Sequence, residues 1–350
     1  MQEQNNDANT IKIDLSEIKD LDLKELVRNI QVFPLETNDS CLIAQNHTVQ
    51  IRNSGIYITN RMKEVLKFDK EGKFLQSTLP FRGQGPNEYI IAYSSYVDKE
   101  DNLGIYEGYI PRIQEYTKDL NFYQSVKMEI PNTRNPQQFR TYAKLNDSTY
   151  LVKDYKDIHF YSVAEEKVVK TIHYEFPDLL SIMTHVQLID YDGKFHYTHT
   201  YSCDTLYYVD EMEMCLKPEL IFDFGGQSFN INDLPLDMSA EYYLNFLFET
   251  DKIVVRDKIN LPDRKYCFFL QGKNSYISCT KENRTTIYKQ NEKNQLPPPD
   301  AIIDNKFYRL VWPDKVEEYI YMELVDKETS DRIGKISEYD NPVLICYELN

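Results

Sequence analysis

The chain has 350 residues and a formal net charge of −16, and 28 of its residues are tyrosine against a single tryptophan. A surface of this sign repels nucleic acid and anionic lipid, and the sequence has no basic cluster that would reverse the effect locally, so we exclude nucleic acid as a partner. The length fits two ordinary domains or one large repeat domain. Tyrosine combines a high strand propensity with a polar tip, which favours an all-β fold.

The first residues form a polar segment. Met1–Asn9 is rich in Gln, Asn and Asp, which predicts disorder, and it lacks the apolar core of a signal peptide. A chain trimmed after a secretion signal and a cytosolic protein would both begin in this way. Leu15–Val27 has apolar positions that are typical of a short helix. We therefore predict a polar tail with a short helix over residues 1–27 and one folded domain over residues 28–350.

From Thr48 onward the sequence predicts short strands at a regular spacing. Each repeat has an apolar strand, a polar turn and a second strand that tends to carry an aromatic residue. The first of these strands begin near Gly55, Leu103, Ser148, Lys194, Lys252 and Lys306, with offsets of about 48, 45, 46, 58 and 54 residues. A period near 46 with four short strands per unit is typical of propeller blades. The fold we expect is an all-β, six-bladed β-propeller with four-stranded antiparallel blades.

Two further features fit this fold. A blade packs on a neighbour through both faces, so its strands need not alternate cleanly, as in Ile56–Ile58 and Phe246–Phe248. The ring must also close. The early strand Ile30–Leu35 and the final strand Val343–Tyr347 stand outside the regular units. We expect strands from both ends of the chain to complete the last blade and hide its edges.

Irregular segments lie between the units. Short loop helices are expected near Leu179 and Ala240. Lys289–Pro299 is polar and ends in three prolines, which predicts a loop. Val316–Ile336 is charged with apolar positions at mixed spacing, and we interpret it as a short helix inserted in the last blade.

The most specific string in the sequence is Phe81–Tyr89, which connects the first repeat to the second. Gly83 and Gly85 allow φ > 0 or a close approach to a neighbouring backbone, and Pro86 fixes one φ angle. We predict structural roles for these three residues and for Tyr89, in which the string crosses from one blade to the next.

Charged residues of this crossover are candidate binding residues. One interpretation places Arg82, Glu88 and Arg112 at the rim of a channel, where they contact a ligand. The other pairs them with one another, so that they tie the crossover to the next blade. His196 and His199 form an HxxH pattern, but on a strand they point to opposite faces. His199 is therefore a candidate for a channel site that other blades complete.

The six cysteines are Cys41, Cys203, Cys215, Cys267, Cys279 and Cys346. None forms a CxxC pair, and they are too sparse for a disulfide scaffold. Cys267 and Cys279 could face each other across adjacent strands. The interpretation we favour is buried free thiols.

Three strings carry a family resemblance: FDKEGKF before the crossover, GQGPNEY within it and PRIQEYTKDLNFY after it. They resemble the NHL-repeat pattern, and most of all the six-bladed propellers of secreted lipoproteins from gut Gram-negative anaerobes. The usual glycine after GQGP is Asn87 here, a residue that tolerates φ > 0. The resemblance implies a propeller that is exported to the periplasm or outer membrane, with a lipid anchor on the native precursor.

Two functions are compatible with these patterns. The first is a non-catalytic envelope protein that binds a glycan, peptide or partner protein through one face of the propeller. The alternative is a metal-dependent lactonase-like or lyase-like enzyme with a divalent metal in the central channel. No GxSxG, HExxH, P-loop or dinucleotide motif occurs, so we assign no catalytic residue, metal ligand or cofactor. We also expect a monomer without a membrane span.

Overall fold

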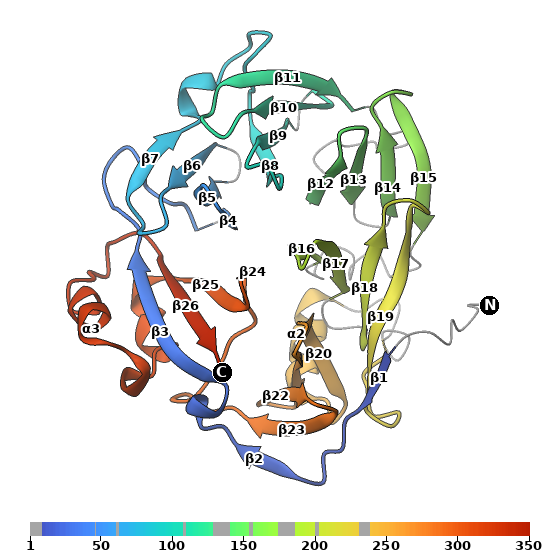
Figure 1. Cartoon of the computed structure of the whole chain (residues 1–350), viewed down its shortest axis with the longest axis vertical. Coiled ribbons are helices and arrows are strands. Elements are labelled where there is room, and N and C mark those ends of the chain that lie inside the picture. Colours follow the sequence, from blue (N-terminus) through green and yellow to red (C-terminus); the bar gives the residue numbers. More distant parts are fainter. Residues whose placement is uncertain are drawn as a thin grey trace.

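The computed structural model describes residues 9–45, 47–60, 63–107, 110–128, 141–153, 157–173, 186–199, 203–230 and 239–350. Six antiparallel sheets are arranged as blades around a central axis, which confirms the predicted six-bladed propeller (Figure 1). In each blade the strands run outward from the axis in chain order, except where the N-terminal segment adds to an outer edge.

The first three blades contain only consecutive strands. Blade 1 consists of β4 (His47–Arg52), β5 (Gly55–Asn60), β6 (Glu64–Phe68) and β7 (Phe74–Ser77). Blade 2 consists of β8 (Ala92–Val97), β9 (Leu103–Glu107), β10 (Arg112–Tyr116) and β11 (Phe122–Lys127). Blade 3 consists of β12 (Thr141–Asn146), β13 (Thr149–Lys153), β14 (Asp157–Ser162) and β15 (Lys167–His173).

The last three blades also take strands from the N-terminal segment. Blade 4 consists of β16 (Val186–Tyr191), β17 (Lys194–His199), β18 (Thr205–Asp210) and β19 (Cys215–Asp223), with β1 (Asn9–Lys12) at its edge. Blade 5 consists of β20 (Ile253–Asn260), β21 (Arg264–Gln271), β22 (Asn274–Lys281) and β23 (Arg284–Lys289), with β2 (Ile18–Asp20) at its edge. Blade 6 consists of β24 (Ala301–Ile303), β25 (Lys306–Val311), β26 (Val343–Leu349) and β3 (Val27–Pro34).

Strands from both ends of the chain close the ring, as predicted. β26 pairs antiparallel with β3, in a register that runs from Val343 opposite Pro34 to Leu349 opposite Val27. β3 is the outermost strand of blade 6. The pairing joins the two ends of the chain in one sheet, so blade 6 holds the ring shut (Figure 1).

The segment before β3 differs from the expected helix over Leu15–Val27. It carries two short strands, which pair parallel with the outer strands β19 and β23, and one turn of 3-10 helix, η1 (Leu23–Glu25). Ile11 and Ile13 are buried against blades 4 and 5. The sequence suggested a helix because its apolar spacing suits one, but an open sheet edge offers hydrogen bonds that a short isolated helix cannot match.

Tyrosines fill much of the space between blades. Tyr57, Tyr106, Tyr116 and Tyr150 are among the largest fully buried side chains. Several buried hydroxyls keep a partner; for example, the Tyr347 hydroxyl donates to the Tyr319 carbonyl oxygen at 2.8 Å. Their rings supply apolar area between the blades, and those hydroxyls that find a partner add hydrogen bonds, a combination that suits tyrosine.

One repeat was aligned wrongly from the sequence. Phe246–Phe248 does not form a strand. It lies in helix α2 (Ala240–Glu249), which confirms the short helix expected near Ala240. The strand that begins near Lys252 is the innermost strand of blade 5, whereas the other five strands in that alignment are the second strands of their blades. The helix lies between β19 and β20 and lengthens this repeat. Its N-cap, Ser239, accepts a hydrogen bond from the Tyr242 backbone N–H at 3.1 Å.

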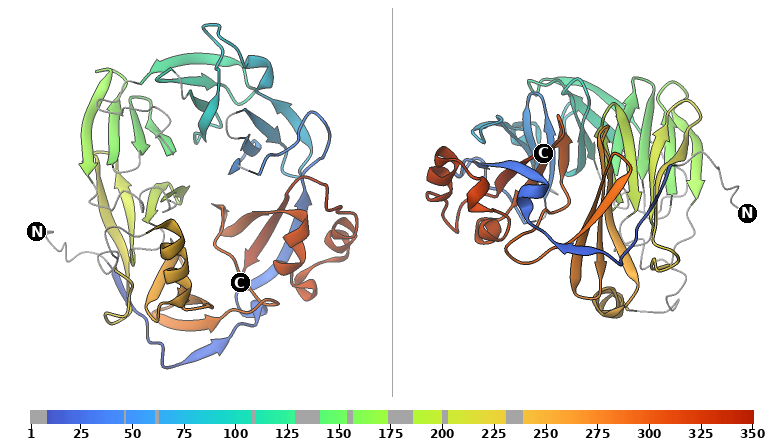
Figure 2. Two further views of the ribbon diagram at one scale, coloured as in Figure 1. Left: turned by 180° about the vertical axis from the view of Figure 1, so that it is seen from behind. Right: turned by 60° about the horizontal axis from the view of Figure 1, so that its bottom comes forward.

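The insertion in the last blade is helical, as predicted. It contains η5 (Pro313–Glu318), η6 (Met322–Leu324) and α3 (Lys327–Ile333), and it projects from the side of the ring next to β3 (Figure 2). A further 3-10 turn, η2 (Leu79–Phe81), opens the crossover after blade 1. The expected helix near Leu179 lies outside the described residues. Across the part of the chain that is described, no helix is long and apolar enough to cross a membrane.

All six cysteines are free thiols, as the sequence indicated, but only three of them are buried. Cys41, Cys267 and Cys346 are buried, whereas Cys203, Cys215 and Cys279 are partly exposed. Cys279 lies opposite Tyr266 in the ladder, and Cys267 lies opposite Ser278, so the two cysteines are one position out of register. Neighbouring positions on a strand face opposite sides of the sheet, and this separates the two sulfurs.

Candidate functional site

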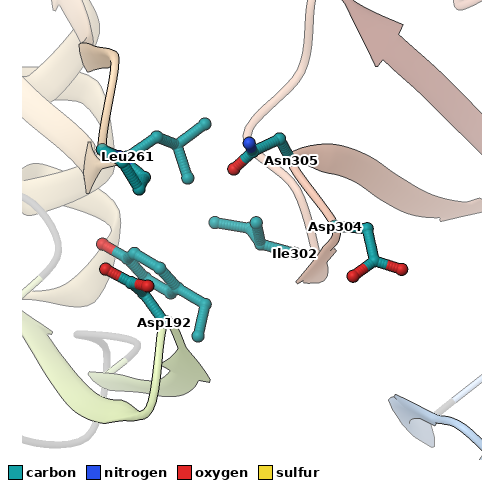
Figure 3. Close-up of a pocket in the computed structure, with 7 residues that line it drawn as sticks. Asp192, Leu261, Ile302, Asp304 and Asn305 are labelled. Atoms are coloured by element: carbon teal, nitrogen blue, oxygen red, sulfur yellow. The ribbon is translucent and has the colours of Figure 1, made fainter.

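The turns that join the first and second strands of the blades all lie at one end of the propeller, which we call the hairpin end. The turns of blades 4, 5 and 6 enclose a cavity of about 180 Å³ there (Figure 3). Its lining residues are Tyr191, Asp192, Leu261, Pro262, Ile302, Asp304 and Asn305. The cavity therefore lies where three blades meet, and no single repeat of the sequence contains it.

Backbone conformation fixes two of the turns at this cavity. Asp192 and Gly193 have φ of 53° and 72°, and Asp304 and Asn305 have φ of 50° and 59°. Two successive residues at positive φ are what a tight two-residue β-hairpin requires, and Asp, Asn and Gly tolerate this best. The same residue types supply polar side chains at the mouth of the cavity, so turn chemistry and lining chemistry coincide.

The walls of the cavity combine apolar residues with polar residues from the turns. Ile302 extends from blade 6 toward blade 4, and the side chain of Asn305 also faces the space between the blades, whereas Asp304 points away from Leu261 and Asp192 (Figure 3). Leu261 and Ile302 are almost fully buried, while Asp192 and Asn305 are exposed. An apolar pocket with a few polar groups at its edge is the usual form of a small-ligand site.

Tyr191 is held rigidly in this wall. Its ring stacks on His196 with centroids 3.8 Å apart and planes at 12°, and its hydroxyl accepts a hydrogen bond from the Asn260 backbone N–H at 3.0 Å. Burial raises the pKa of Tyr191 well above its ordinary value. The phenol is therefore neutral at physiological pH and gives the cavity a fixed aromatic wall.

His196 stacks on Tyr191, and Glu219 in turn contacts His196. The Nε2 atom of His196 lies 2.8 Å from Glu219 Oε2, and Lys194 Nζ lies 2.8 Å from Glu219 Oε1. Burial alone would raise the pKa of Glu219, but hydrogen bonds from His196 and Lys194 outweigh it and lower the pKa to about 2. This carboxylate is thus ionised at neutral pH and fixes the imidazole beneath the tyrosine.

An ion pair next to the cavity joins opposite sides of the ring. Arg52 ends the innermost strand of blade 1, and its Nη1 atom lies 3.0 Å from Asp190 Oδ1 in blade 4. The Arg52 Nε–H also donates to the Val97 carbonyl oxygen at 2.9 Å, and its guanidinium lies 5.7 Å from the centre of the Tyr96 ring. Since Asp190 directly precedes Tyr191, this pair positions the strand that forms one wall of the cavity.

The charged residues of the crossover lie in blade 2 and in the segment that leads into it from blade 1. Arg112 Nε lies 2.6 Å from Oε2 of the buried Glu107, and Arg112 Nη2 donates to the Glu88 carbonyl oxygen at 2.8 Å. Arg82 Nε donates to the Ile90 carbonyl oxygen at 3.0 Å. These contacts bring Glu88 and Arg112 together, while Arg82 bonds elsewhere. Contact with a ligand stays a prediction for all three residues.

The crossover glycines are packed closely against Glu88. Neither Gly83 nor Gly85 is among the glycines with positive φ, but a Cβ atom at Gly83 would overlap the Glu88 carboxylate. The Gly85 backbone N–H donates to Glu88 Oε2 at 2.8 Å. Close approach, rather than an unusual backbone angle, is what these positions require.

The other two crossover residues are also fixed by the fold. Pro86 accepts a hydrogen bond from Gln114 at 3.1 Å through its carbonyl oxygen, and Tyr89 is fully buried with its hydroxyl 2.7 Å from Thr78 Oγ1.

The HxxH pattern lies in strand β17, as expected. His196 takes part in the stack described above, and His199 ends the strand, but the side chain of His199 lies outside the described residues. Within the described ranges, no group of three or more His, Cys, Asp or Glu side chains is placed to hold a metal ion. The role of His199 in a channel site stays a prediction.

Sequence reasoning did not find the cavity or the ion pair. Asp192-Gly193 has the residue types of a tight hairpin turn, but nothing in the sequence near Ile302 indicates that it faces this turn. The sequence did not indicate the pairing of Arg52 with Asp190, because that requires knowing which strand is innermost in every blade of the ring. Once each strand is assigned to its position in its blade, the residues that end the innermost strands are expected to lie near one another at the hairpin end.

Comparison with known proteins adds a family. Residues 8–348 match the family described as Domain of unknown function (DUF4934). The chain is a member of this family. A search of curated proteins found no match for this DUF4934 member.

Two solved structures with the same fold come from Bacteroides species. A candidate exported protein from Bacteroides fragilis is 17% identical, with a TM-score of 0.66 over 97% of this chain and 99% of that one. A member of the duf4221 family from Bacteroides vulgatus is 12% identical, with a TM-score of 0.55 over 93% and 98% of the two chains. At these identities the likeness of the DUF4934 member to both structures is one of fold.

Proposed function

We propose that this protein is an exported, non-catalytic binding protein that takes one sugar residue of a glycan into the cavity at the hairpin end. The observation that carries the proposal is the cavity of about 180 Å³ enclosed by three blades, with an aromatic wall and polar side chains at its mouth. A cavity of this size suits a single sugar ring rather than a drug-sized ligand, which needs about 300 Å³ or more.

The lining chemistry favours a polyhydroxylated ligand that is neutral or cationic. The Asp192 carboxylate and the Asn305 carboxamide can accept and donate hydrogen bonds to hydroxyl groups. Leu261 and Ile302 can pack on the apolar face of a sugar ring. The net charge of −16 opposes the approach of an anion to this exposed acidic rim.

Export is part of the proposal. It is supported by the Bacteroides fragilis relative, which is itself a candidate exported protein, and by the resemblance of the GQGPNEY string to NHL-like repeats of secreted lipoproteins. A lipid anchor on the native precursor would place the propeller in the periplasm or at the outer membrane. Membrane fractionation with a radiolabelled lipid precursor tests this part separately, and a native protein without lipid label in the soluble cytosolic fraction would contradict it.

A glycan array followed by titration calorimetry tests the binding role. We expect the wild-type protein to bind a neutral or amino-sugar glycan, and we expect Asp192→Asn and Ile302→Trp to weaken that binding at least tenfold. Asp147→Asn is the matched control, because Asp147 is an exposed residue in the equivalent hairpin of blade 3, away from the cavity. Equal loss in the control variant, or binding to a peptide array alone, would contradict the proposal.

We propose no resident cofactor. Elemental analysis of protein purified without chelator tests this statement. A stoichiometric divalent metal would instead support the lactonase-like or lyase-like alternative.

A further inference from the structure

The innermost strand of blade 5 contains a β-bulge at Arg256. Val255 lies opposite Phe269 and Asp257 lies opposite Phe268, so Arg256 has no partner in the ladder. β20 pairs with β21 along one edge only, and its other edge borders the central axis (Figure 1). Bulges redirect side chains and are over-represented beside active sites.

The Arg256 guanidinium is partly buried and has no hydrogen-bond or ion-pair partner among the described residues. The other partly buried arginines of the described residues do have ion-pair partners. Each of those pairs with a carboxylate: Arg52 with Asp190, Arg112 with Glu107, Arg264 with Asp263, Arg309 with Asp300 and Arg332 with Glu328. An unpaired, partly desolvated guanidinium in a protein of net charge −16 requires an explanation.

The neighbouring carboxylate does not supply the missing partner. Asp257 is only 2% exposed; its Oδ1 atom accepts a hydrogen bond from the Lys258 backbone N–H at 2.7 Å, and its Oδ2 atom is buried without a partner. The Lys258 amine donates instead to the Cys203 carbonyl oxygen at 2.7 Å. Arg309, from blade 6, is already paired with Asp300 at 2.6 Å.

These groups form an electrostatic cluster at the innermost strands. Burial raises the pKa of Asp257 to about 6, and the positive charges of Lys258, Arg256 and Arg309 oppose that rise. Both guanidiniums are therefore close enough to interact electrostatically with Asp257. Arg256 donates no hydrogen bond to Asp257, so its N–H groups are not occupied by this interaction. Five donor N–H groups in a planar fork remain available there.

We propose that Arg256 is the anchor of a second binding site, which holds the carboxylate of a small monoanionic ligand in the central channel. A planar guanidinium matches carboxylate and phosphate equally well in shape. The charge of the protein discriminates between them, because a net charge of −16 opposes a dianion more strongly than a monoanion. The carboxylate is therefore the favoured ligand group.

This site goes beyond the proposed glycan cavity and does not depend on it. The cavity is formed by the hairpin turns, including Leu261 and Pro262, whereas Arg256 lies in the middle of β20. Asp192→Asn therefore probes the first site and Arg256→Gln probes the second. Failure of one proposal leaves the other measurable.

Titration calorimetry with D-glucuronate tests the proposal, with D-glucose as the uncharged probe and inorganic phosphate, which is partly dianionic at neutral pH, as the more highly charged probe. We expect the wild-type protein to bind glucuronate at least tenfold more tightly than glucose and more tightly than phosphate. Arg256→Gln should remove that preference, and Arg256→Lys, which keeps the charge but loses the planar fork, should retain part of it. Asp192→Asn should leave it unchanged.

The matched control is Arg284→Gln, which removes an equal charge from an exposed position at the start of β23. A loss in this variant equal to that in Arg256→Gln would show a general electrostatic effect and overturn the proposal. Equal binding of glucuronate and glucose by the Asp192→Asn variant, in which the first site is impaired, would also overturn it, and so would a preference of that variant for phosphate. If Arg256→Gln does not fold, the wild-type comparison of the three probes and Arg256→Lys decide the matter.

Discussion

Arg52 in blade 1 and Asp190 in blade 4 lie 3.0 Å apart, although their blades occupy opposite positions in the six-membered ring. Their side chains are only 16% and 25% exposed. Contacts between neighbouring blades are expected in any propeller, but this one crosses the axis. It therefore fixes the diameter of the ring at the hairpin end, beside the cavity.

We predict that Asp190→Asn lowers the free energy of unfolding by about 1–3 kcal/mol, because it leaves the partly buried Arg52 charge without its counter-ion. Chemical denaturation monitored by tyrosine fluorescence measures the change. The exposed pair Lys315–Glu318 provides the control, since Glu318→Gln should change stability by less than about 1 kcal/mol. Equal effects at the two sites would contradict a special role for the cross-ring pair.

Gly83→Ala should destabilise the protein by about 1–3 kcal/mol, since the new Cβ atom must displace the Glu88 carboxylate that caps Gly85. In a Glu88→Ala background the same substitution should cost much less, because the obstacle is gone. Thermal melts of the two single variants and the double variant measure this coupling. Strictly additive effects would show that Gly83 is restricted by something other than Glu88.

Protonation of Asp257 should make the folded protein more stable in mild acid than at neutral pH. Burial raises its pKa in the folded state from 3.8 to about 6, so the folded protein binds the proton more tightly than the unfolded chain does. The free energy of unfolding should therefore fall as pH rises from about 4 to 6, by up to about 3 kcal/mol. Asp257→Asn should flatten this dependence and stabilise the protein at pH 7. A pH series of denaturation curves tests both statements, and an unchanged slope in the variant would contradict them.

Glu219 should act in the opposite direction at lower pH. Its pKa falls from 4.5 to about 2 on folding, so its contribution to stability is complete above about pH 4.5 and is lost as pH falls toward 2. Glu219→Gln should remove up to about 3 kcal/mol at pH 7 and should reduce the acid dependence below pH 4.5. Near-ultraviolet circular dichroism would report the loss of the Tyr191–His196 stack, and an unchanged aromatic signal in the variant would contradict this assignment.

Local patterns in the sequence were enough to predict the architecture. The strand and turn residues of each repeat and the two terminal strands reflect chemistry within a few residues, and the six blades followed from them. Phe246–Phe248 suggested a strand because a run of apolar residues suits a buried strand and a buried helix face equally well. The helix expected near Ala240 includes this run, and the N-cap Ser239 directly before it is the local signal for the helix.

The candidate sites required information that no local pattern contains. Arg52 and Asp190 are separated by three blades in the chain, and the bulge that isolates Arg256 depends on the register between β20 and β21. Register and blade phase are properties of the assembled ring. The residues of the crossover were conspicuous in the sequence because a tight backbone path needs particular residue types, whereas the cavity is lined by ordinary residues brought together from three hairpins.

The closure of blade 6 by β3 and β26 has a consequence for biosynthesis. β3 is made early, and its antiparallel partner β26 is made only when almost the whole chain has been synthesised, since residue 27 pairs with residue 349. Blade 6 cannot be completed until then, so an exposed β-edge persists throughout translation and any passage through a membrane. Such an edge is prone to pair with other chains. The propeller is therefore expected to depend on a holding factor until its last strand arrives, and truncation of β26 should yield an aggregating chain rather than a five-bladed ring.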